Sequence, residues 1–244
     1  VLFPEIARRY TETRLPPDRD FAFDLGELVI PEGTTLVVIV NPNNPNGGIF
    51  DMAPLPDLLR RHPQTRFLVD EAFIGLAGES VVPLVPSHPN LLVTRTLSKA
   101  HSLAGFRVGY AVLPVAIAAE LNGANDAYPL ARASEAAAVA TLEHENEILA
   151  RANALRAWTE ALAGELRSLG VRTWPTRTYF FLADFAPHDT ISCRKVLERL
   201  ASEKLVRGAI ASAAGAPIGF LFAQPNLTAP DSALSYFSPA FSVG

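Results

Sequence analysis

Short apolar runs recur along the first half of the chain, and a polar cluster follows most of them. Three runs are rich in Val, Ile and Leu and predict buried strands, at residues 35–40, 66–69 and 91–95. The run at 35–40 is nearly unbroken, which is typical of a strand covered on both faces in a parallel sheet. A helix is predicted over 53–62 and a fourth strand over 108–113. Strands that alternate with helices over short spacings predict an α/β fold with a mainly parallel sheet.

The second half of the chain begins with a long helical stretch. Residues 131–169 are rich in Ala, Glu, Leu and Arg and contain no proline, which predicts one long helix or two helices with a break near Asn153. A strand over 178–183 and an amphipathic helix over 191–203 follow, and together they indicate a smaller α+β domain. We therefore expect two domains, at residues 1–130 and 131–244.

The ends of the chain give weaker patterns. A short helix is plausible over residues 3–14, before the Leu15-Pro16-Pro17-Asp18 break. After Arg207 the only charged residue is Asp231, and we find neither a helix face nor clean strand alternation there. We expect this tail to be either an apolar, partly ordered segment or a sequence foreign to the fold.

Composition narrows the functional classes. The 244 residues are 49% hydrophobic and 19% charged, as in a soluble globular protein. The net charge of −4 provides no basic patch for nucleic acid or for a membrane surface. The single cysteine, Cys193, excludes an internal disulfide framework and fits a reducing compartment. No signal peptide or membrane-spanning segment is visible, so we expect a cytoplasmic protein, and the first residue, Val1, suggests a fragment or a processed product.

Three polar clusters follow predicted strands. They lie at residues 41–48, at residues 70–73 and in the segment 94–110 that contains Lys99. Carboxyl ends of parallel strands share one edge of a sheet, and open α/β sheets bind their ligands at that edge. We therefore expect the three clusters to form one site.

Lys99 is the most informative residue of this site, because the chain has only two other lysines, Lys195 and Lys204. Taken alone, a loop lysine is usually solvated. Here Thr96 and Ser98 flank it and Arg107 follows, so a nucleophilic amine stands near donors for an anion. This combination suits an imine with an aldehyde cofactor that carries a phosphate.

The three clusters together resemble pyridoxal-phosphate-dependent enzymes of fold type I, the class I and II aminotransferases. Within them, the histidinol-phosphate aminotransferase and threonine-phosphate decarboxylase group is most similar. Residues 43–47 (Asn-Asn-Pro-Asn-Gly) resemble the family's Asn-Asn-Pro-Thr-Gly loop, and residues 69–73 (Val-Asp-Glu-Ala-Phe) resemble its Val-Asp-Glu-Ala-Tyr/Phe strand end. Residues 95–110 resemble its lysine segment, including the arginine spacing. The resemblance covers residues 1 to about 207 and implies a cofactor domain with a smaller C-terminal α+β domain.

The resemblance also implies roles for single residues. Lys99 would bind the cofactor and then move the α-proton. Asp70 would pair with the pyridinium nitrogen, and Asn44 would bind the ring oxygen. The phosphate would be held by Thr96, Ser98 and Arg107. A surface or helix-cap carboxylate is the alternative for Asp70, and a structural ion pair is the alternative for Arg107. No metal is implied.

Four departures from the family pattern stand out. Phe73 occupies a position where many relatives have tyrosine, although threonine-phosphate decarboxylases also carry Phe there. For the aromatic residue that stacks on the cofactor, the Pro4 segment offers Ile6, with Tyr10 as a nearby substitute. The family's N-terminal part, with a phosphate-binding helix start, is missing. No arginine follows Arg207, where relatives have one for the substrate carboxylate.

The composition after Arg207 and the missing arginine suggest a tail altered by truncation or a reading-frame change. A mass and DNA-level check around residues 207–220 tests this hypothesis, and an intact reading frame would reject it.

The expected function is transfer of an amino group between an amino acid or histidinol phosphate and a 2-oxoacid. Threonine-phosphate decarboxylase activity and a non-catalytic, truncated remnant are the alternatives. By resemblance we expect a homodimer.

Overall fold

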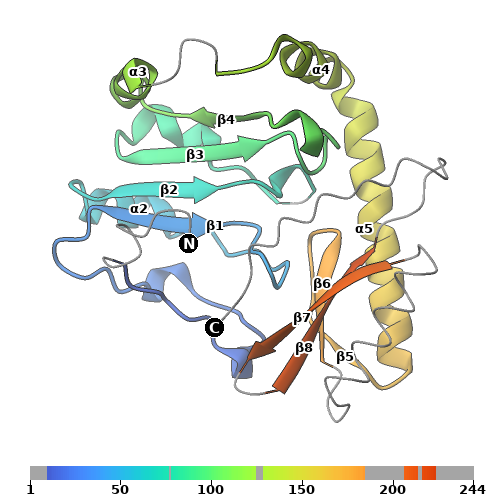
Figure 1. Cartoon of the computed structure of the whole chain (residues 1–244). Helices are drawn as coiled ribbons and strands as arrows, with labels where there is room; N and C mark the ends of the chain where they lie inside the picture. Colours follow the sequence, from blue (N-terminus) through green and yellow to red (C-terminus); the bar gives the residue numbers. More distant parts are fainter. Residues whose placement is uncertain (1–9, 77, 125–128, 185–205, 214–215, 224–244) are drawn as a thin grey trace.

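The computed structural model describes residues 10–76, 78–124, 129–184, 206–213 and 216–223. A first sheet contains four strands in sequence order: β1 (Leu36–Val40), β2 (Arg66–Asp70), β3 (Leu91–Thr96) and β4 (Gly109–Val112). Strands β1 to β3 are parallel, and β4 is antiparallel to β3 (Figure 1). The predicted α/β fold with a mainly parallel sheet is confirmed, and each predicted strand lies within two residues of its observed bounds.

The register of the sheet aligns the ends of the three parallel strands. Val40 pairs with Asp70, and Asp70 pairs with Thr94. The loops that follow these residues therefore leave the sheet side by side at the carboxyl ends of the parallel strands, as expected from the sequence.

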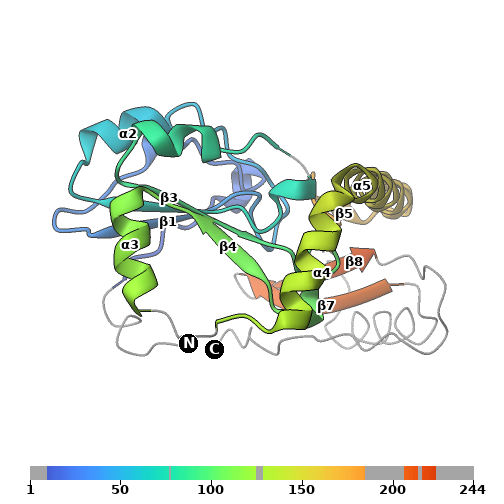
Figure 2. The same ribbon diagram turned by 90° about the horizontal axis from the view of Figure 1, so that it is seen from above.

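The main core lies on one face of this sheet, between the strands and two short helical segments (Figure 2). These are α2 (Leu55–Arg61) and the 3-10 helix η4 (Val82–Ser87). The three buried leucines of α2 recur at helical spacing and pack against alternate residues of β2 and β3. All of these side chains are buried: Leu55, Leu58, Leu59, Phe67, Val69, Leu91 and Val93. The remaining 3-10 helices are η1 (Pro17–Arg19), η2 (Leu25–Glu27), η3 (Ile74–Leu76) and η5 (Ala104–Phe106).

The opposite face of the sheet is only partly covered. Helix α3 (Val115–Ala124) lies on this side (Figure 2), where Glu120 is 3.7 Å from Arg66 of β2. Leu36 and Val38 of β1 remain 49% and 55% exposed. The prediction that this strand is covered on both faces is therefore wrong for the described part of the chain. The reason is that Leu36 and Val38 point to the face opposite the main core, and the described helices leave β1 open on that face.

Two helices replace the single long helical stretch. They are α4 (Arg132–Glu143) and α5 (Glu145–Ser168), and the break falls at His144 instead of the predicted Asn153. The His144 N–H donates to Thr141 O, which ends α4 in a tight turn, and the His144 carbonyl then accepts the first N–H bonds of α5. Helix α5 runs from the first sheet to the second (Figure 1). None of the described helices is long and apolar enough to cross a membrane.

The second sheet is antiparallel, in the order β5-β6-β8-β7. Its strands are β5 (Arg172–Thr173), β6 (Phe180–Asp184), β7 (Val206–Ala213) and β8 (Ala216–Ala223). No clean strand alternation was found after Arg207 in the sequence, yet β7 and β8 pair with each other there, and β8 pairs with β6.

Two further helices were predicted from the sequence, over residues 191–203 and 3–14. The helix predicted over 191–203 lies outside the described residues. Of the stretch 3–14, the structure describes residues 10–14, and these are not helical.

Candidate functional site

The loop after β1 contains four asparagines, and three of them fold the loop. Asn41 Oδ1 accepts the Phe50 N–H at 3.0 Å, and Asn46 Oδ1 accepts the Gly48 N–H at 2.9 Å. Asn43 Nδ2 lies 3.5 Å from Val40 O. Asn44 is exposed, and its amide makes no hydrogen bond within the described part of the chain. The loop therefore presents the amide of Asn44, the asparagine predicted to bind the cofactor ring.

Asp70 stands at the end of β2, and one side of its carboxylate is occupied. Its Oδ1 accepts the Ala72 N–H at 3.0 Å and lies 3.4 Å from Thr94 Oγ1 on the neighbouring strand. These bonds hold the carboxylate at the strand end, while Oδ2 accepts no hydrogen bond from the described residues. Oδ2 is therefore available to accept a hydrogen bond from a protonated ring nitrogen.

Lys99 follows β3 and is half-buried. Burial is the largest cause that lowers the pKa of its amine, the positive charge of Arg107 lowers it further, and the Asp70 carboxylate partly opposes both. A lower pKa increases the neutral fraction of the amine, and only the neutral amine is a nucleophile. The electrostatics thus couple three of the predicted site residues.

The predicted phosphate donors lie on both sides of Lys99 along the chain. Thr96 Oγ1 accepts the Ser98 N–H at 3.1 Å, and the two hydroxyl oxygens are 2.9 Å apart. Arg107 is exposed, has left-handed backbone angles (φ 56°, ψ 44°) and donates from Nη1 to Ala104 O at 3.0 Å. The remaining guanidinium N–H groups are available to an anion.

Phe73 joins the lysine to the second sheet. Lys99 Nζ is 5.1 Å from the centroid of its ring, and the rings of Tyr179 and Phe180 approach it at 6.0 and 5.0 Å. Phe73 is thus predominantly a packing residue, at 5% exposure. Tyr179 was not predicted as part of this environment, because only the contact between the two sheets brings it there.

Tyr10, suggested by the sequence as a substitute stacking aromatic, is 57% exposed, and the neighbouring Glu12 raises the pKa of its hydroxyl. No contact links it to the Lys99 environment among the described residues.

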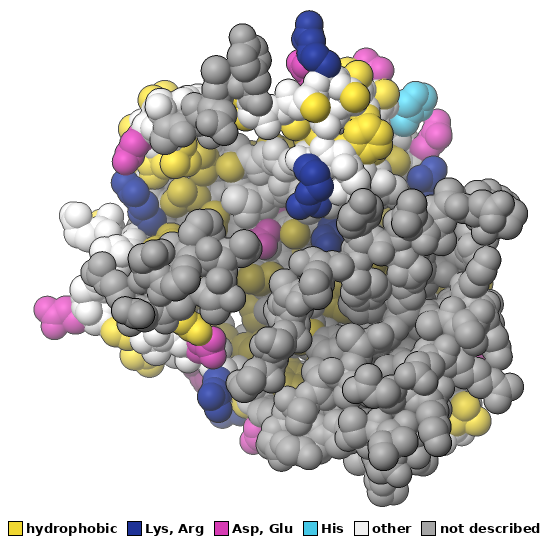
Figure 3. Space-filling model, in the orientation of Figure 1, with side chains coloured by type: hydrophobic (Ala, Val, Ile, Leu, Met, Phe, Trp, Pro, Cys, Tyr) yellow, Lys and Arg dark blue, Asp and Glu magenta, His cyan; other side chains and the backbone are white. Residues whose placement is uncertain are grey.

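The face shown in Figure 3 carries acidic and basic side chains close together near the carboxyl ends of the parallel strands. The structure links Lys99 to Asp70, Arg107 and Phe73, and links Thr96 to Ser98. Asn44 is placed at the same sheet edge by its strand but makes no described contact with Lys99. Within the described ranges, no group of His, Cys, Asp and Glu is arranged to hold a metal ion.

Glu71, next to Asp70, was not singled out by the sequence, and it is 2% exposed. Its Oε2 accepts Arg95 Nε at 2.9 Å and Ser80 Oγ at 2.8 Å, and its Oε1 accepts the Val81 N–H at 2.7 Å. Successive residues at a strand end point to opposite sides, so this carboxylate ties the loop after β2 to β3. That alternation indicates that the Glu71 side chain leaves the strand on the side opposite Asp70, but it does not identify the partners that bury it.

The chain matches the family model described as aminotransferase class I and II over residues 9–214. It is 38% identical over 205 residues to histidinol-phosphate aminotransferase 2 of Thiobacillus denitrificans, which covers 78% of this chain and 56% of that protein. The chain thus spans little more than half the length of this curated relative.

Two solved structures share the fold. L-threonine-O-3-phosphate decarboxylase from Porphyromonas gingivalis has a TM-score of 0.72 at 21% identity, covering 84% of this chain and 63% of that one. Histidinol-phosphate aminotransferase from Sinorhizobium meliloti, solved in complex with pyridoxal-5'-phosphate, has a TM-score of 0.66 at 24% identity, covering 80% and 54%.

Proposed function

The chain belongs to the aminotransferase class I and II family, and from this we propose that it binds pyridoxal 5′-phosphate at Lys99 and transfers amino groups. The donor would be an amino acid or histidinol phosphate, and the acceptor a 2-oxoacid. The observation that carries the proposal is the half-buried Lys99, whose pKa is lowered mainly by burial, beside Asp70 and Arg107.

The donor set fits the cofactor. Asp70 has an oxygen available for the ring nitrogen, Asn44 an unbonded amide for the ring oxygen, and Arg107 exposed N–H groups for the phosphate. When bound, pyridoxal phosphate supplies an electron sink that stabilises charge at the substrate α-carbon. Lys99 would attach it and, when displaced by substrate, would carry the α-proton. Thr96 and Ser98 would add hydroxyl donors to the phosphate.

A decarboxylase is the second candidate. Phe73 at the end of the Asp-Glu-Ala segment and the fold shared with the Porphyromonas decarboxylase favour it. Both reactions use the same electron sink, so the cofactor residues do not discriminate between them. A non-catalytic remnant is a third candidate, because the sequence after Arg207 has no arginine where the resemblance implies one for the substrate carboxylate. The proposal also includes a homodimer, as the resemblance implies, and a cytoplasmic location, which the single cysteine favours.

The three lysines allow a clean test of attachment. Purified protein is mixed with pyridoxal phosphate, and the visible absorbance band is recorded before and after borohydride reduction. We expect a band in the wild type and in Lys195→Ala and Lys204→Ala, and none in Lys99→Ala. A band of equal strength in Lys99→Ala would overturn the assignment of this residue.

Product analysis separates the reactions. With glutamate or histidinol phosphate as donor, a transaminase consumes one 2-oxoacid for each molecule of oxo product formed from the donor, which is a 2-oxoacid from glutamate and a ketone from histidinol phosphate. Release of CO₂ from threonine phosphate without consumption of a 2-oxoacid would instead identify the decarboxylase. A lysine-dependent band with neither product would identify the remnant.

A further inference from the structure

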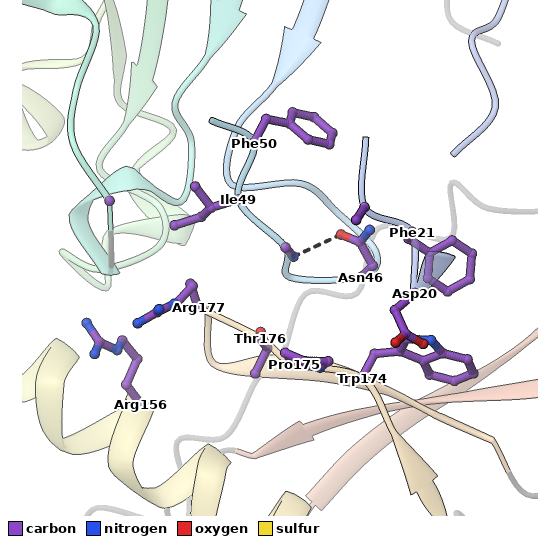
Figure 4. Close-up of a pocket in the computed structure, with 13 residues that line it drawn as sticks. Asp20, Phe21, Asn46, Ile49, Phe50, Arg156, Trp174, Pro175, Thr176 and Arg177 are labelled. Carbon is purple, nitrogen blue, oxygen red and sulfur yellow. Dashed lines mark hydrogen bonds between the residues drawn. The ribbon is translucent and has the colours of Figure 1, made fainter. Parts of the chain in front are cut away.

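The segment after β5, residues 174–178, connects the second sheet to the loop after β1. The Arg177 backbone N–H donates to Gly47 O at 2.8 Å. Gly47 has φ +71°, and the Thr176 side chain occupies the space that a Cβ at Gly47 would need. In Figure 4, Thr176 and Arg177 lie beneath the loop that also carries Asn46. The segment is therefore fixed to the loop that presents Asn44.

A cavity of about 570 Å³ lies on one side of this segment, between the loop after β1 and helix α5 (Figure 4). Residues 174–177 line the cavity, whereas Tyr179 and Phe180 do not. These two aromatic residues instead pack against Phe73, which follows β2. The same stretch of chain thus contacts the loops of the first sheet at Gly47 and at Phe73.

The chain on either side of Tyr179 is held by hydrogen bonds. The Thr176 and Thr178 hydroxyls both donate to Phe180 O, at 2.6 and 3.0 Å. Thr178 and Phe180 are fully buried. Because both neighbours of Tyr179 are fixed, its ring keeps one place in the contact between the two sheets.

Tyr179 contributes its ring to this contact. The ring centroid lies 6.0 Å from that of Phe73 and 5.7 Å from that of Phe180, and Lys99 Nζ lies 5.1 Å from the Phe73 centroid. Burial raises the pKa of Tyr179 to about 12 and lowers the pKa of Lys99. The two polar groups beside this aromatic cluster are therefore poorly hydrated.

We propose that Tyr179 is a positioning residue for Lys99: its ring holds Phe73 against the lysine and keeps water from the amine. It acts through Phe73, so the contact between the two sheets controls how readily the amine reacts. The role in catalysis rests on the proposed function, whereas the shielding of the amine is a property of the chain without cofactor.

The test is an NMR titration of the Lys99 side chain in the 244-residue chain without pyridoxal phosphate. The signal is identified by its absence in Lys99→Arg. Tyr179→Ala should admit water and raise the pKa of Lys99 toward its ordinary value, because weaker desolvation favours the charged amine. With pyridoxal phosphate added at neutral pH, the visible band should form about twofold or more slowly, since a smaller fraction of the amine is neutral.

Tyr179→Phe is the matched variant, because it keeps the ring and removes only the hydroxyl. It should leave the pKa of Lys99 as in the wild type. Trp158→Ala removes a ring of α5 that is 53% exposed, and it should also leave this pKa unchanged. Where Tyr179→Ala does not fold, Tyr179→Val keeps an apolar side chain of high strand propensity and should raise the pKa of Lys99 in the same direction.

A purely structural role for Tyr179 has a different signature. It would lower the free energy of unfolding of Tyr179→Ala, measured by denaturant titration, while the pKa of Lys99 stayed as in the wild type, and this result would overturn the proposal. An equal rise of the pKa in Tyr179→Phe or in Trp158→Ala would overturn it too. Absence of a visible band in the wild type would reject the proposed function, and the NMR titration would still decide the role of Tyr179.

Discussion

The amine of Lys99 lies over the ring of Phe73, with 5.1 Å between Nζ and the ring centroid. The same ring packs edge-on against Tyr179 and Phe180, which follow the segment after β5. One aromatic residue therefore separates the lysine from the second sheet and helps to exclude water from its amine. The relationship explains how a lysine on a loop becomes half-buried, and it makes the charge state of Lys99 dependent on its neighbours.

The pKa of Lys99 should move in opposite directions in two variants. Arg107 lowers this pKa and Asp70 raises it, so Arg107→Gln should raise the pKa and Asp70→Asn should lower it further. The measurement is an NMR titration of the lysine side-chain signal that is absent in Lys99→Arg. Arg132→Gln serves as the control for loss of a distant charge. Shifts of the same sign in both variants would contradict the described electrostatics.

The sign of the stability effect follows from the same shift. The folded pKa of Lys99 lies below the ordinary lysine value of 10.5, so the folded chain binds fewer protons than the unfolded chain between the two values. The associated stability is present above 10.5 and is lost as the pH falls through the folded pKa. Lys99→Met should therefore reduce the pH dependence of unfolding in that window, as measured by denaturant titrations at several pH values.

Glu71 should matter for stability far more than an exposed carboxylate. Its side chain is 1% exposed and pairs with Arg95 at 2.9 Å, while the Arg95 side chain is 27% exposed. Glu71→Gln places an amide NH₂ against donors from Arg95, Ser80 and Val81, and it should cost about 2–5 kcal/mol of unfolding free energy.

The matched control is Asp57→Asn. Asp57 bonds Arg60 and Arg61 on the exposed face of α2, at 2.9 and 2.8 Å. Loss of such pairs should cost at most about 1 kcal/mol. Chemical denaturation measures both variants, and similar losses for the two would show that the buried pair is not a structural tie.

The parallel sheet and its polar edge could be predicted because each strand is a short apolar run bounded by turn-forming residues. Asp70 and Lys99 each have an ordinary structural explanation when taken alone, and they stood out because their clusters follow predicted strands and together resemble the family's motifs. Glu71 was missed because its burial depends on Arg95 and Ser80, which are distant in sequence.

Two other features depend on tertiary context in the same way. Strand β7 is rich in Ala, Gly and Ser, which have low strand propensity, and it forms by pairing with β8, which in turn pairs with β6. The helix break at His144 lies in a stretch without Gly or Pro and has no breaker to mark it. The cavity beside Arg177 arises from segments that are more than a hundred residues apart, so no local pattern could reveal it.

Gly47 should be intolerant of a side chain. It has φ +71°, and an added Cβ would collide with Thr176 Oγ1 and lie 2.9 Å from Thr178 Oγ1. Gly47→Ala should therefore destabilise the fold by strain and by overpacking, and it should loosen the contact between the loop after β1 and the second sheet.

Gly33→Ala separates the effect of backbone strain from the effect of overpacking. Gly33 has a similar φ of +79°, but no atom lies within 4 Å of an added Cβ. Gly47→Ala should cost about 1–3 kcal/mol more than Gly33→Ala, which is the overpacking contribution. Denaturant midpoints provide the comparison, and equal losses would mean that the loop does not rest on Thr176.

Tyr179 should ionise only at high pH. Burial raises its pKa from 10.0 to about 12, because the phenolate would lose hydration beside Phe73 and Phe180. The folded chain therefore holds this proton more tightly than the unfolded chain. The associated stability is complete below pH 10.0 and is lost as the pH rises toward about 12.

Ultraviolet titration of tyrosinate absorbance measures the ionisation directly, and Tyr179→Phe should remove the step near pH 12. Tyr110→Phe, at a residue that is 42% exposed, should leave that step in place. A high-pH step that survives in Tyr179→Phe would show that the ring is not buried between the two sheets.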